Sequence, residues 1–445
     1  MSEAALVPKL RFSEFSDEWE AGYLNEFIDS LDAGVSVNST DRQAESNEKC
    51  ILKTSCVSSG VFKLKENKVV LDDDEIQRLK EPLQSNTIII SRMNTPALVG
   101  ANAIVTYSMS NVFLPDRLWA AKINKNYSGK WLGILMSSTK FRAALSARAT
   151  GTSASMKNIT KGDVLSLKIT YPAKPEQQKI AAFLTAVDNK IEQLSKKQEL
   201  LGEYKKGAMQ QIFSQAIRFH SKGTSSQAQG EIDDTPGQPL LPNGNSPSGS
   251  DFPDWEEKKL GDITDLITKG TTPTSVGYNF TTEGINFIKV ESIKNFKIDI
   301  GSVPKISEEC HHHLKRSQLK NNDIVFSIAG TLGRTAIVKN KDLPANTNQA
   351  LSIIRLNRSQ HILFVHYLLN LESIDKYIHR MLSVGAQPNL SLQQVGDIQL
   401  QLPSLLEQSK ITNFLSFIDS KIEQVGKQLD ESKQFKKALL QQMFI

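Results

Sequence analysis

Two long stretches of the chain carry apolar residues at intervals of three and four positions, which is the spacing of one face of an α-helix. In residues 176–213 these positions are Ile180, Leu184, Val187, Ile191, Leu194, Leu201, Ala208 and Ile212. In residues 407–444 they are Ile411, Leu415, Ile418, Ile422, Val425, Leu429, Leu439 and Met443. Polar residues interrupt both runs, with a lysine, Lys205 or Lys436, at the same register of each. The pattern predicts two long helices, each with a heptad seam of the coiled-coil type.

The two predicted helices are copies of one sequence. Residues 176–213 align with residues 407–444 without a gap and are identical at 17 of 38 positions. Upstream of the helices, "FSDEWEAGYL" corresponds to "DFPDWEEKKL", and residues 83–105 resemble residues 319–338. A repeat of this extent means that the chain consists of two similar halves.

Both halves show the same predicted order of elements: a tryptophan-containing entry, short β-like runs such as "NTIIISR" and "NDIVFSI", and then the long helix. Between the halves, a segment rich in Ser, Gly, Gln, Asn and Pro predicts a flexible linker. The fold class is therefore α+β, with two mixed α/β domains and two long helices. The predicted division is a globular domain at 1–150, a helical region at 151–218, the linker at 219–251, a second globular domain at 252–385 and a second helical region at 386–445.

The helix starts carry their own signals, since Pro175 with Glu176 suits a first turn and Ser404 with Glu407 has the spacing of a capping box. A helix of about 38 residues is roughly 57 Å long, which is more than a compact domain of this size buries lengthwise. We expect the two helices to pair as an antiparallel coiled coil about a pseudo-twofold axis. Two separately packed helices, or a parallel zipper between two chains, are the alternatives.

Composition restricts the class of protein only mildly. Of the 445 residues, 39% are hydrophobic and 23% charged, and no apolar run approaches the roughly 18 residues of a membrane span. Three cysteines without a CxxC pair and an N-terminus without a signal pattern predict a reduced, cytoplasmic protein. The net charge of +5 permits a nucleic-acid partner without requiring one.

Motifs of independent catalysis are absent from the sequence. There is no P-loop, no Asn-Pro-Pro-aromatic segment of an amino-methyltransferase and no glycine fingerprint of a dinucleotide site. The segment "PDWEEKK" superficially resembles a nuclease motif, but Asp254 and Glu256 are too close to come from successive strands. We expect no active site in this chain.

Two polar runs resemble metal sites. The run "ECHHHL" includes Cys310, yet adjacent residues do not converge easily on one tetrahedral ion, so a solvated loop is expected. The acidic run "LDDDEI" at residues 71–76 is expected to be a solvated turn rather than a magnesium site. No metal ligands are therefore predicted.

The globular domains share a frame but differ in content, as in "ILKTSCVSSGVF" and "FIKVESIKNFKI", where only Lys53 and Lys289 are identical. A shared arrangement of elements with different side chains indicates that the two domains perform related functions on different targets. Two half-sites on one DNA duplex would be such targets. Arginine suits guanine, Asn and Gln suit adenine, and Lys, Ser and Thr suit phosphates. The residues expected at a DNA-facing edge are Arg92, Asn94, Arg148, Lys157, Lys269, Thr271, Thr272, Arg334, Asn348, Gln349, Gln387 and Asn389. Each position also fits a role in supporting the fold.

The order of elements, applied twice, resembles the specificity subunit of type I restriction–modification enzymes. In the second half, "KGTTPTSVGYNF", "NDIVFSIAGTLGRTAIV" and "NTNQALSI" are similar to that family's target recognition domains, as is "SRMNTPALVG" in the first half. "PSLLEQSKITNFLSFIDSKIEQ" resembles its second conserved region. The resemblance covers nearly the whole chain except the linker, which is longer than expected.

This resemblance implies that residues 1–150 and 252–385 are target recognition domains, each reading one part of a split double-stranded DNA sequence, while the coiled coil sets the gap. It also implies two methyltransferase subunits, which use S-adenosylmethionine, and two translocase–nuclease subunits, which use ATP and Mg²⁺. The chain itself would bind no cofactor and would not be catalytic. Outward residues such as Lys190 and Glu192 are expected to face the methyltransferase. A coiled-coil adaptor with two protein-binding heads and an independent DNA-modifying enzyme are the alternatives.

Overall fold

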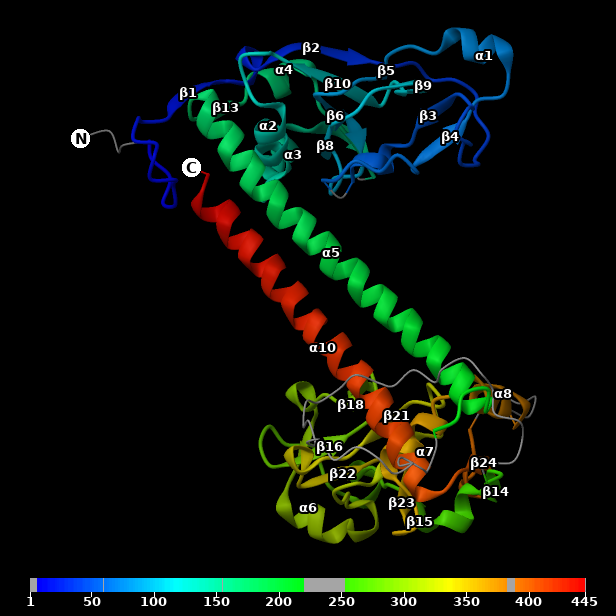
Figure 1. Cartoon of the computed structure of the whole chain (residues 1–445). Coiled ribbons are helices and arrows are strands. Elements are labelled where there is room, and N and C mark those ends of the chain that lie inside the picture. The colour runs from blue at the N-terminus through cyan, green and yellow to red at the C-terminus, as the bar shows by residue number, and fades with distance from the viewer. Residues whose placement is uncertain (1–5, 59, 154, 220–252, 382–388, 445) are drawn as a thin grey trace, which may run out of the picture. The chain divides into compact units, whose positions relative to one another are not determined.

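A computed structural model gives the structure of the chain and describes residues 6–58, 60–153, 155–219, 253–381 and 389–444 (Figure 1). The chain forms two compact units. Unit 1 consists of Met1–Lys197 together with Val425–Ile445, and unit 2 consists of Gln198–Gln424. Each long helix therefore contributes to both units. The predicted five-segment division is finer than this one and stays a prediction, and almost all of the predicted linker lies outside the described residues.

Unit 1 combines short strands with helices. Its strands are β1 (Glu20–Tyr23), β2 (Ile28–Ala33), β3 (Cys50–Leu52), β4 (Asn67–Val69), β5 (Pro82–Leu83), β6 (Thr87–Ser91), β7 (Met93–Asn94), β8 (Asn102–Val105), β9 (Met109–Phe113), β10 (Leu118–Ile123), β11 (Thr150–Ser153), β12 (Met156–Asn158) and β13 (Lys168–Tyr171). Its helices are α1 (Asp73–Arg78), α2 (Gly129–Ser137), α3 (Thr139–Arg148), α4 (Lys161–Leu165), the first part of α5 (Lys174–Phe213) and the last part of α10 (Leu405–Gln442).

Unit 2 has the same kind of content. Its strands are β14 (Glu256–Lys259), β15 (Thr264–Lys269), β16 (Ile285–Ile288), β17 (Ile293–Lys294), β18 (Lys297–Ile298), β19 (Lys305–Ile306), β20 (Ile324–Ser327), β21 (Thr335–Ile337), β22 (Ala345–Thr347), β23 (Leu351–Leu356) and β24 (Gln399–Leu402). Its helices are α6 (Glu308–His313), α7 (Ile362–Leu368), α8 (Glu372–Met381), α9 (Leu392–Gly396), the end of α5 and the start of α10.

The two units are built on one frame. The main sheet has the strand order β2-β10-β6-β8 in unit 1 and β15-β23-β20-β21 in unit 2, all antiparallel. A smaller sheet contains one parallel pair in each unit, β3 with β9 and β16 with β22. A two-stranded ladder precedes each long helix, β1 with β13 and β14 with β24. The α+β fold and the internal repeat predicted from the sequence are confirmed.

One inner strand of each main sheet, β6 or β20, is buried on both faces, which explains its apolar sequence. In β6, Ile88 and Ile90 pack into the core that includes α2, α3 and the long helices, while Ile89 packs into a second core behind the sheet. Strand β20 repeats this alternation in unit 2. The predicted β-like runs therefore contain strands that are buried along their whole length.

A glycine follows the first strand of each main sheet because the chain passes very close there. A Cβ atom added to Gly34 would lie 1.5 Å from the carbonyl oxygen of Leu114, and one added to Gly270 would lie 2.0 Å from that of Thr347. A side chain at either position would displace the opposing backbone. The equivalent clash in both units shows how closely the frames correspond.

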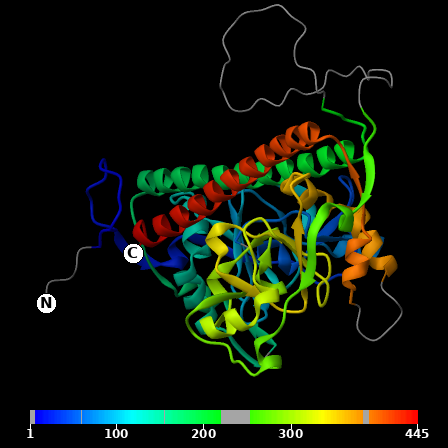
Figure 2. The same ribbon diagram turned by 90° about the horizontal axis from the view of Figure 1, so that it is seen from below.

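Within each unit, the parts of the two long helices that belong to it lie side by side and run antiparallel (Figure 2). In unit 1, Ile180 and Leu184 near the start of α5 share a core with Leu439 and Met443 near the end of α10. In unit 2 the helices exchange roles, since the end of α5 packs against the start of α10. The predicted antiparallel coiled coil is confirmed, and the parallel zipper between two chains is not needed to cover the seam.

The predicted seam positions all face inward to some degree. Eight of the twelve are buried, namely Ile180, Leu184, Leu194, Ile411, Leu415, Ile418, Val425 and Leu429. The other four, Val187, Ile191, Leu201 and Ile422, are half-buried.

The lysines that interrupt the apolar pattern form ion pairs across the helix pair. In unit 2, Lys205 Nζ on α5 lies 2.6 Å from Asp419 Oδ1 on α10, and in unit 1, Lys436 Nζ on α10 lies 2.5 Å from Asp188 Oδ1 on α5. The residues of one pair occupy the repeat positions of the other, offset by 231. A charge at a seam position specifies register and partner, so these pairs favour one antiparallel alignment.

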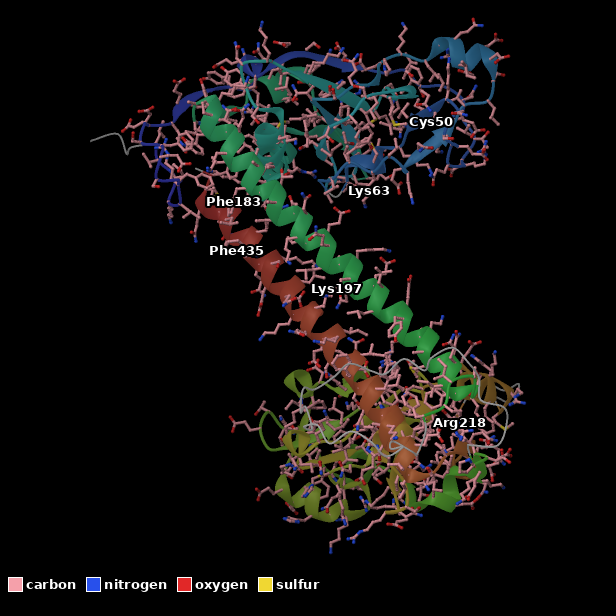
Figure 3. The ribbon with its side chains drawn as sticks, viewed as in Figure 1. Cys50, Lys63, Phe183, Lys197, Arg218 and Phe435 are labelled. Carbon is pink, nitrogen blue, oxygen red and sulfur yellow. The ribbon has the colours of Figure 1, made fainter. Side chains whose placement is uncertain are left out.

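Identical residues at the two helix starts make equivalent contacts. Glu176 accepts two hydrogen bonds from Arg11, at 2.8 and 2.7 Å, and Glu407 accepts two from Arg218, at 2.7 and 2.9 Å (Arg218 is labelled in Figure 3). The neighbouring glutamines, Gln177 and Gln408, donate to the carbonyl oxygens of Pro172 and Pro403, the prolines that follow the preceding strands. The repeated letters "EQ" are therefore structural.

The capping box predicted at the start of α10 forms only in part. Ser404 Oγ accepts from the backbone N–H of Glu407 at 3.4 Å. The Glu407 carboxylate instead binds Arg218, because a buried carboxylate gains more from a guanidinium than from a backbone amide.

In unit 1, residues near the N-terminus lie beside the end of α10. In unit 2, the residues that directly follow α5 in the chain make the equivalent contacts with the end of α5. In unit 2, the chain leaves α5 and the N–H of Ile217 donates to the carbonyl of Gln211 at 3.1 Å. In unit 1, the N–H of Leu10 donates to the carbonyl of Gln442 at 2.9 Å, although the two residues lie at opposite ends of the sequence. Aromatic contacts follow in both cases, Phe12 with Phe183 and Phe219 with Phe414, at 5.7 and 5.8 Å between ring centroids (Phe183 is labelled in Figure 3).

Both polar runs that resembled metal sites are short helices, so the predicted loop and turn are wrong. Ser307 caps α6 by accepting from Cys310 N at 3.2 Å, and the acidic residues before the histidines suit the helix dipole. Asp72 caps α1 by accepting from Asp74 N and Glu75 N. Helix capping and favourable interactions with the helix dipole stabilise a helix in both segments, whereas the prediction of a loop and a turn relied on the polarity of the residues. Within the described segments, no helix combines the length and hydrophobicity needed to cross a bilayer.

Candidate nucleic-acid interface

Most of the predicted DNA-binding residues of unit 2 lie at one end of its main sheet. The ladders pair Lys269 with Ser352, Leu351 with Ser327 and Phe326 with Thr335, so β15, β23, β20 and β21 all begin or end there. The turns at this end hold Lys269, Thr271, Thr272, Arg334, Asn348 and Gln349. The structure thus brings together residues that are up to 80 positions apart in the chain.

The side chains at this end divide into anchored and free groups. Thr271 N donates to the carbonyl of Thr347 at 3.1 Å, and the Thr272 hydroxyl donates to Gln349 Oε1. Asn348 Oδ1 accepts from Ala350 N at 3.2 Å, which makes it part of the turn before β23. Lys269 and Arg334 are exposed, and neither forms an ion pair with any described residue. Two uncompensated cations beside ordered hydroxyl and amide groups suit a polyanionic ligand.

The segment before the second long helix reaches the same edge. Leu390 N donates to the carbonyl of Ile328, the residue after β20, at 2.9 Å, and this contact places the exposed Asn389 beside the turn that carries Arg334. Gln387 lies outside the described residues.

In unit 1 the predicted residues are less concentrated. Lys157 on β12 pairs with Asn94 on β7, and Ile159 N donates to the carbonyl of Arg92, so these three residues are neighbours at the end of β6. Arg92 lies over Trp119, with 5.9 Å between its Cζ atom and the ring centroid. Asn94 supports its own turn, donating to Ser91 Oγ at 3.1 Å and accepting from Thr95 N at 2.8 Å.

Arg148 does not join that group. It donates to the carbonyl of Asp163 at 2.9 Å and to Ser166 Oγ at 2.8 Å, which ties the end of α3 to α4. We therefore assign Arg148 a part in holding the fold, a role that periodicity and residue type did not distinguish from DNA binding.

Sequence reasoning missed two arginines at these edges. Arg117 precedes β10, is exposed, and accepts from Arg92 N through its backbone carbonyl at 3.1 Å. Arg316 is exposed on a 3₁₀ turn, η7 (Lys315–Ser317), which packs against β15, and its Nη2 donates to Thr271 Oγ1 at 3.3 Å. Aligning the main-sheet strands of the two units would have identified Arg117, because it lies next to the position that corresponds to Gln349. No local sequence pattern marks Arg316.

Thiols and metal clusters are two kinds of reactive group that can be examined in the described residues. The three cysteines are buried thiols, and burial raises the pKa of Cys56 to about 12, which keeps it protonated and unreactive. Across the described ranges, no group of three or more His, Cys, Asp or Glu side chains has the arrangement to hold a metal ion.

Comparison with known proteins agrees with this geometry. A profile described as "Type I restriction modification DNA specificity domain" matches twice, over residues 16–201 and 253–431. The type I restriction enzyme MjaVIII specificity subunit of Methanocaldococcus jannaschii is 23% identical over 436 residues, which cover 95% of this chain and 91% of the relative. The EcoBI specificity subunit of Escherichia coli is 28% identical over 153 residues, 34% of this chain and 32% of that one.

A crystal structure of a type I restriction–modification S subunit from M. genitalium has the same fold, with a TM-score of 0.60 at 17% identity, and covers 99% of both chains. The two profile matches together span more than half of the sequence, one in each half of the repeat. The chain therefore belongs to the family of type I restriction–modification DNA specificity subunits.

Proposed function

We propose that this chain reads a bipartite double-stranded DNA sequence, with unit 1 recognising one part and unit 2 the other. The observation that carries this proposal is the repetition of one frame with different side chains at equivalent sheet ends. Ser91 and Ser327 end equivalent strands, but Arg92 follows the first and Ile328 the second. A shared scaffold with altered readout groups is what two different half-sites require.

The antiparallel helix pair would fix the number of unspecified base pairs between the two parts. Buried apolar seam residues and one ion pair support its register within each unit, and a single register would give the helix pair one length. Half-site spacing then follows from protein geometry, as in other DNA-binding proteins with two reading heads.

The partners of the complex follow from the family. The helix pair and the segments beside it would bind two methyltransferase subunits and, through them, two restriction and translocase subunits, all in the cytoplasm. Those partner subunits would use S-adenosylmethionine, ATP and Mg²⁺, and this chain would contribute no catalytic group. Lys190 and Glu192 are exposed on α5 and available to a partner.

The proposal is tested by mapping methylated bases in the genome of a host that carries this chain with its methyltransferase subunit. We expect a split motif, and we expect that exchanging residues 1–150 for those of a relative alters only one of its two parts. A change in both parts would refute the one-unit, one-half-site arrangement. A complex with no sequence-dependent DNA affinity would instead support an adaptor with two protein-binding heads.

A further inference from the structure

Two consecutive threonines at the end of β15 each contact a long polar side chain from another part of unit 2. Arg316 Nη2 donates to Thr271 Oγ1 at 3.3 Å, and the Thr272 hydroxyl donates to Gln349 Oε1. Arg316 and Gln349 are both exposed, whereas the threonines are half-buried. Because the threonines are adjacent in the chain, both exposed side chains are held at the same end of the main sheet.

The backbone beneath Arg316 is held by a buried polar network. Asn346 is fully buried, and its Nδ2 donates to the carbonyl of Leu314 at 3.1 Å and to Ser317 Oγ at 3.2 Å. Its Oδ1 contacts His311 Nδ1. Burying an amide is unfavourable unless its hydrogen bonds are made, and here they connect η7 to β22. The network leaves the Arg316 backbone little freedom.

Thr271 restrains the other end of the same side chain. Its N–H bonds to the carbonyl of Thr347, the residue after Asn346, so both restraints on Arg316 converge on one strand. A side chain that is fixed at both ends loses little conformational entropy when it binds, and this preorganisation is what a base-reading group needs.

We propose that Arg316 reads a guanine and Gln349 reads an adenine in the half-site recognised by unit 2, with Thr271 and Thr272 as positioning residues. This inference rests on the proposed function and deepens it by naming the bases. Arg316 keeps guanidinium donors for guanine O6 and N7 after one is engaged by Thr271. Gln349 Nε2 donates to adenine N7, and the second lone pair of its Oε1 accepts from N6. The threonines therefore act through their neighbours and not on phosphates.

Lys315 provides a matched control for Arg316. It is the preceding residue of η7, is exposed and carries the same charge, but an ammonium group lacks the planar fork that guanine recognition uses. Loss of Lys315 would weaken binding to every sequence alike, whereas loss of Arg316 would weaken binding to one base in particular.

The test compares genomic methylation motifs in hosts that carry the methyltransferase subunit with wild-type chain, Arg316→Gln, Arg316→Lys or Lys315→Gln. Both Arg316 variants are expected to lose discrimination at one guanine by about tenfold or more, while the other half of the motif stays unchanged. Thr271→Val is expected to relax the same position to a smaller extent. Gln349→Leu and Thr272→Val are expected to relax one adenine. Lys315→Gln is expected to reduce methylation without changing the motif.

A wild-type motif retained in full by Arg316→Gln would overturn the guanine assignment while leaving the proposed function intact. If the Arg316 variants abolish methylation, competition binding of the purified complexes to duplexes substituted at each guanine decides the matter. Discrimination equal to wild type at every guanine would then refute the assignment. Failure of the wild-type chain to direct a split motif would contradict the proposed function itself.

Discussion

Replacing Glu407 by Gln is expected to destabilise unit 2 by about 3 kcal/mol. The carboxylate of Glu407 and the guanidinium of Arg218 form a two-pronged ion pair at 2.7 and 2.9 Å, with side chains only 6% and 12% exposed. Removing one member of a buried pair typically costs about 3–5 kcal/mol because the other charge stays buried without its partner. The lower end applies because Gln keeps the shape of Glu and can accept one hydrogen bond.

The assay is native-state hydrogen exchange of the full chain, read by mass spectrometry on peptides from α7 and the start of α10. A loss of 3 kcal/mol corresponds to exchange faster by roughly 150-fold in these helices. The matched control is Glu256→Gln in the same unit, whose side chain is 68% exposed and pairs with the half-buried Lys258. That substitution is expected to leave exchange in these helices nearly unchanged, because solvent screens an exposed ion pair.

Adding Arg218→Met to Glu407→Gln is expected to recover much of the loss, because no unpaired charge then remains buried. Equal effects of Glu407→Gln and Glu256→Gln would refute the reasoning, since burial is the difference on which it depends. A double variant less stable than Glu407→Gln alone would show that Arg218 contributes mainly through its other contacts, including its position 5.5 Å from the ring centroid of Trp255.

Other predictions concern the backbone, the seam and pH. Gly270→Ala is expected to destabilise unit 2 by about 3 kcal/mol or more in thermal or urea unfolding, because its Cβ would lie 2.0 Å from a carbonyl oxygen, whereas Gly207→Ala, with open space around it on α5, should stabilise by about 1 kcal/mol. Replacing Lys205 and Lys436 together by Leu should leave the free energy of unfolding equal or higher. It should also cause association of chains, measured by light scattering, because the seam loses the charged residues that specify its register and partner. An unchanged monodisperse state would contradict this. Burial lowers the pKa of His366 to about 4, so its neutral form is favoured in the fold, and the stability it contributes is present above about pH 6.5 and lost as pH falls toward 4. Between pH 7 and pH 5, the free energy of unfolding of His366→Gln should therefore fall by about 2 kcal/mol less than that of the wild-type chain. Equal falls would exclude this role of His366.

Much of the helical architecture was predictable from local pattern. The seam positions are spaced by the helix repeat, and the two lysines in register already indicated a shared contact, because a charge in a seam needs a partner. The partners themselves, Asp188 and Asp419, were visible as identical residues in the repeat. Only the antiparallel pairing showed which lysine meets which aspartate, since each ion pair joins residues more than 200 positions apart.

The candidate interface was predictable by residue type but not by role. Thr271, Thr272 and Gln349 were identified as polar groups near strand ends, yet the contact of Thr272 with Gln349 depends on how β15 and β23 are aligned. Arg148 and Arg316 have the same chemistry, and the structure assigns one to the fold and the other to the exposed edge. Hydrogen bonds between distant segments decide between these roles, and no window of sequence contains both partners.

The sequence by itself determined the duplication, the α+β class, the two long helices and the family, because periodicity and repeat are properties of a linear chain. Tertiary structure decided which surfaces those elements share. It placed Leu10 against the end of α10, converted the repeated "EQ" into two buried ion pairs, and gathered one edge of the unit 2 sheet from four strands. These outcomes depend on which distant segments meet, and that is settled by burial of apolar surface and satisfaction of buried polar groups over a whole unit at once.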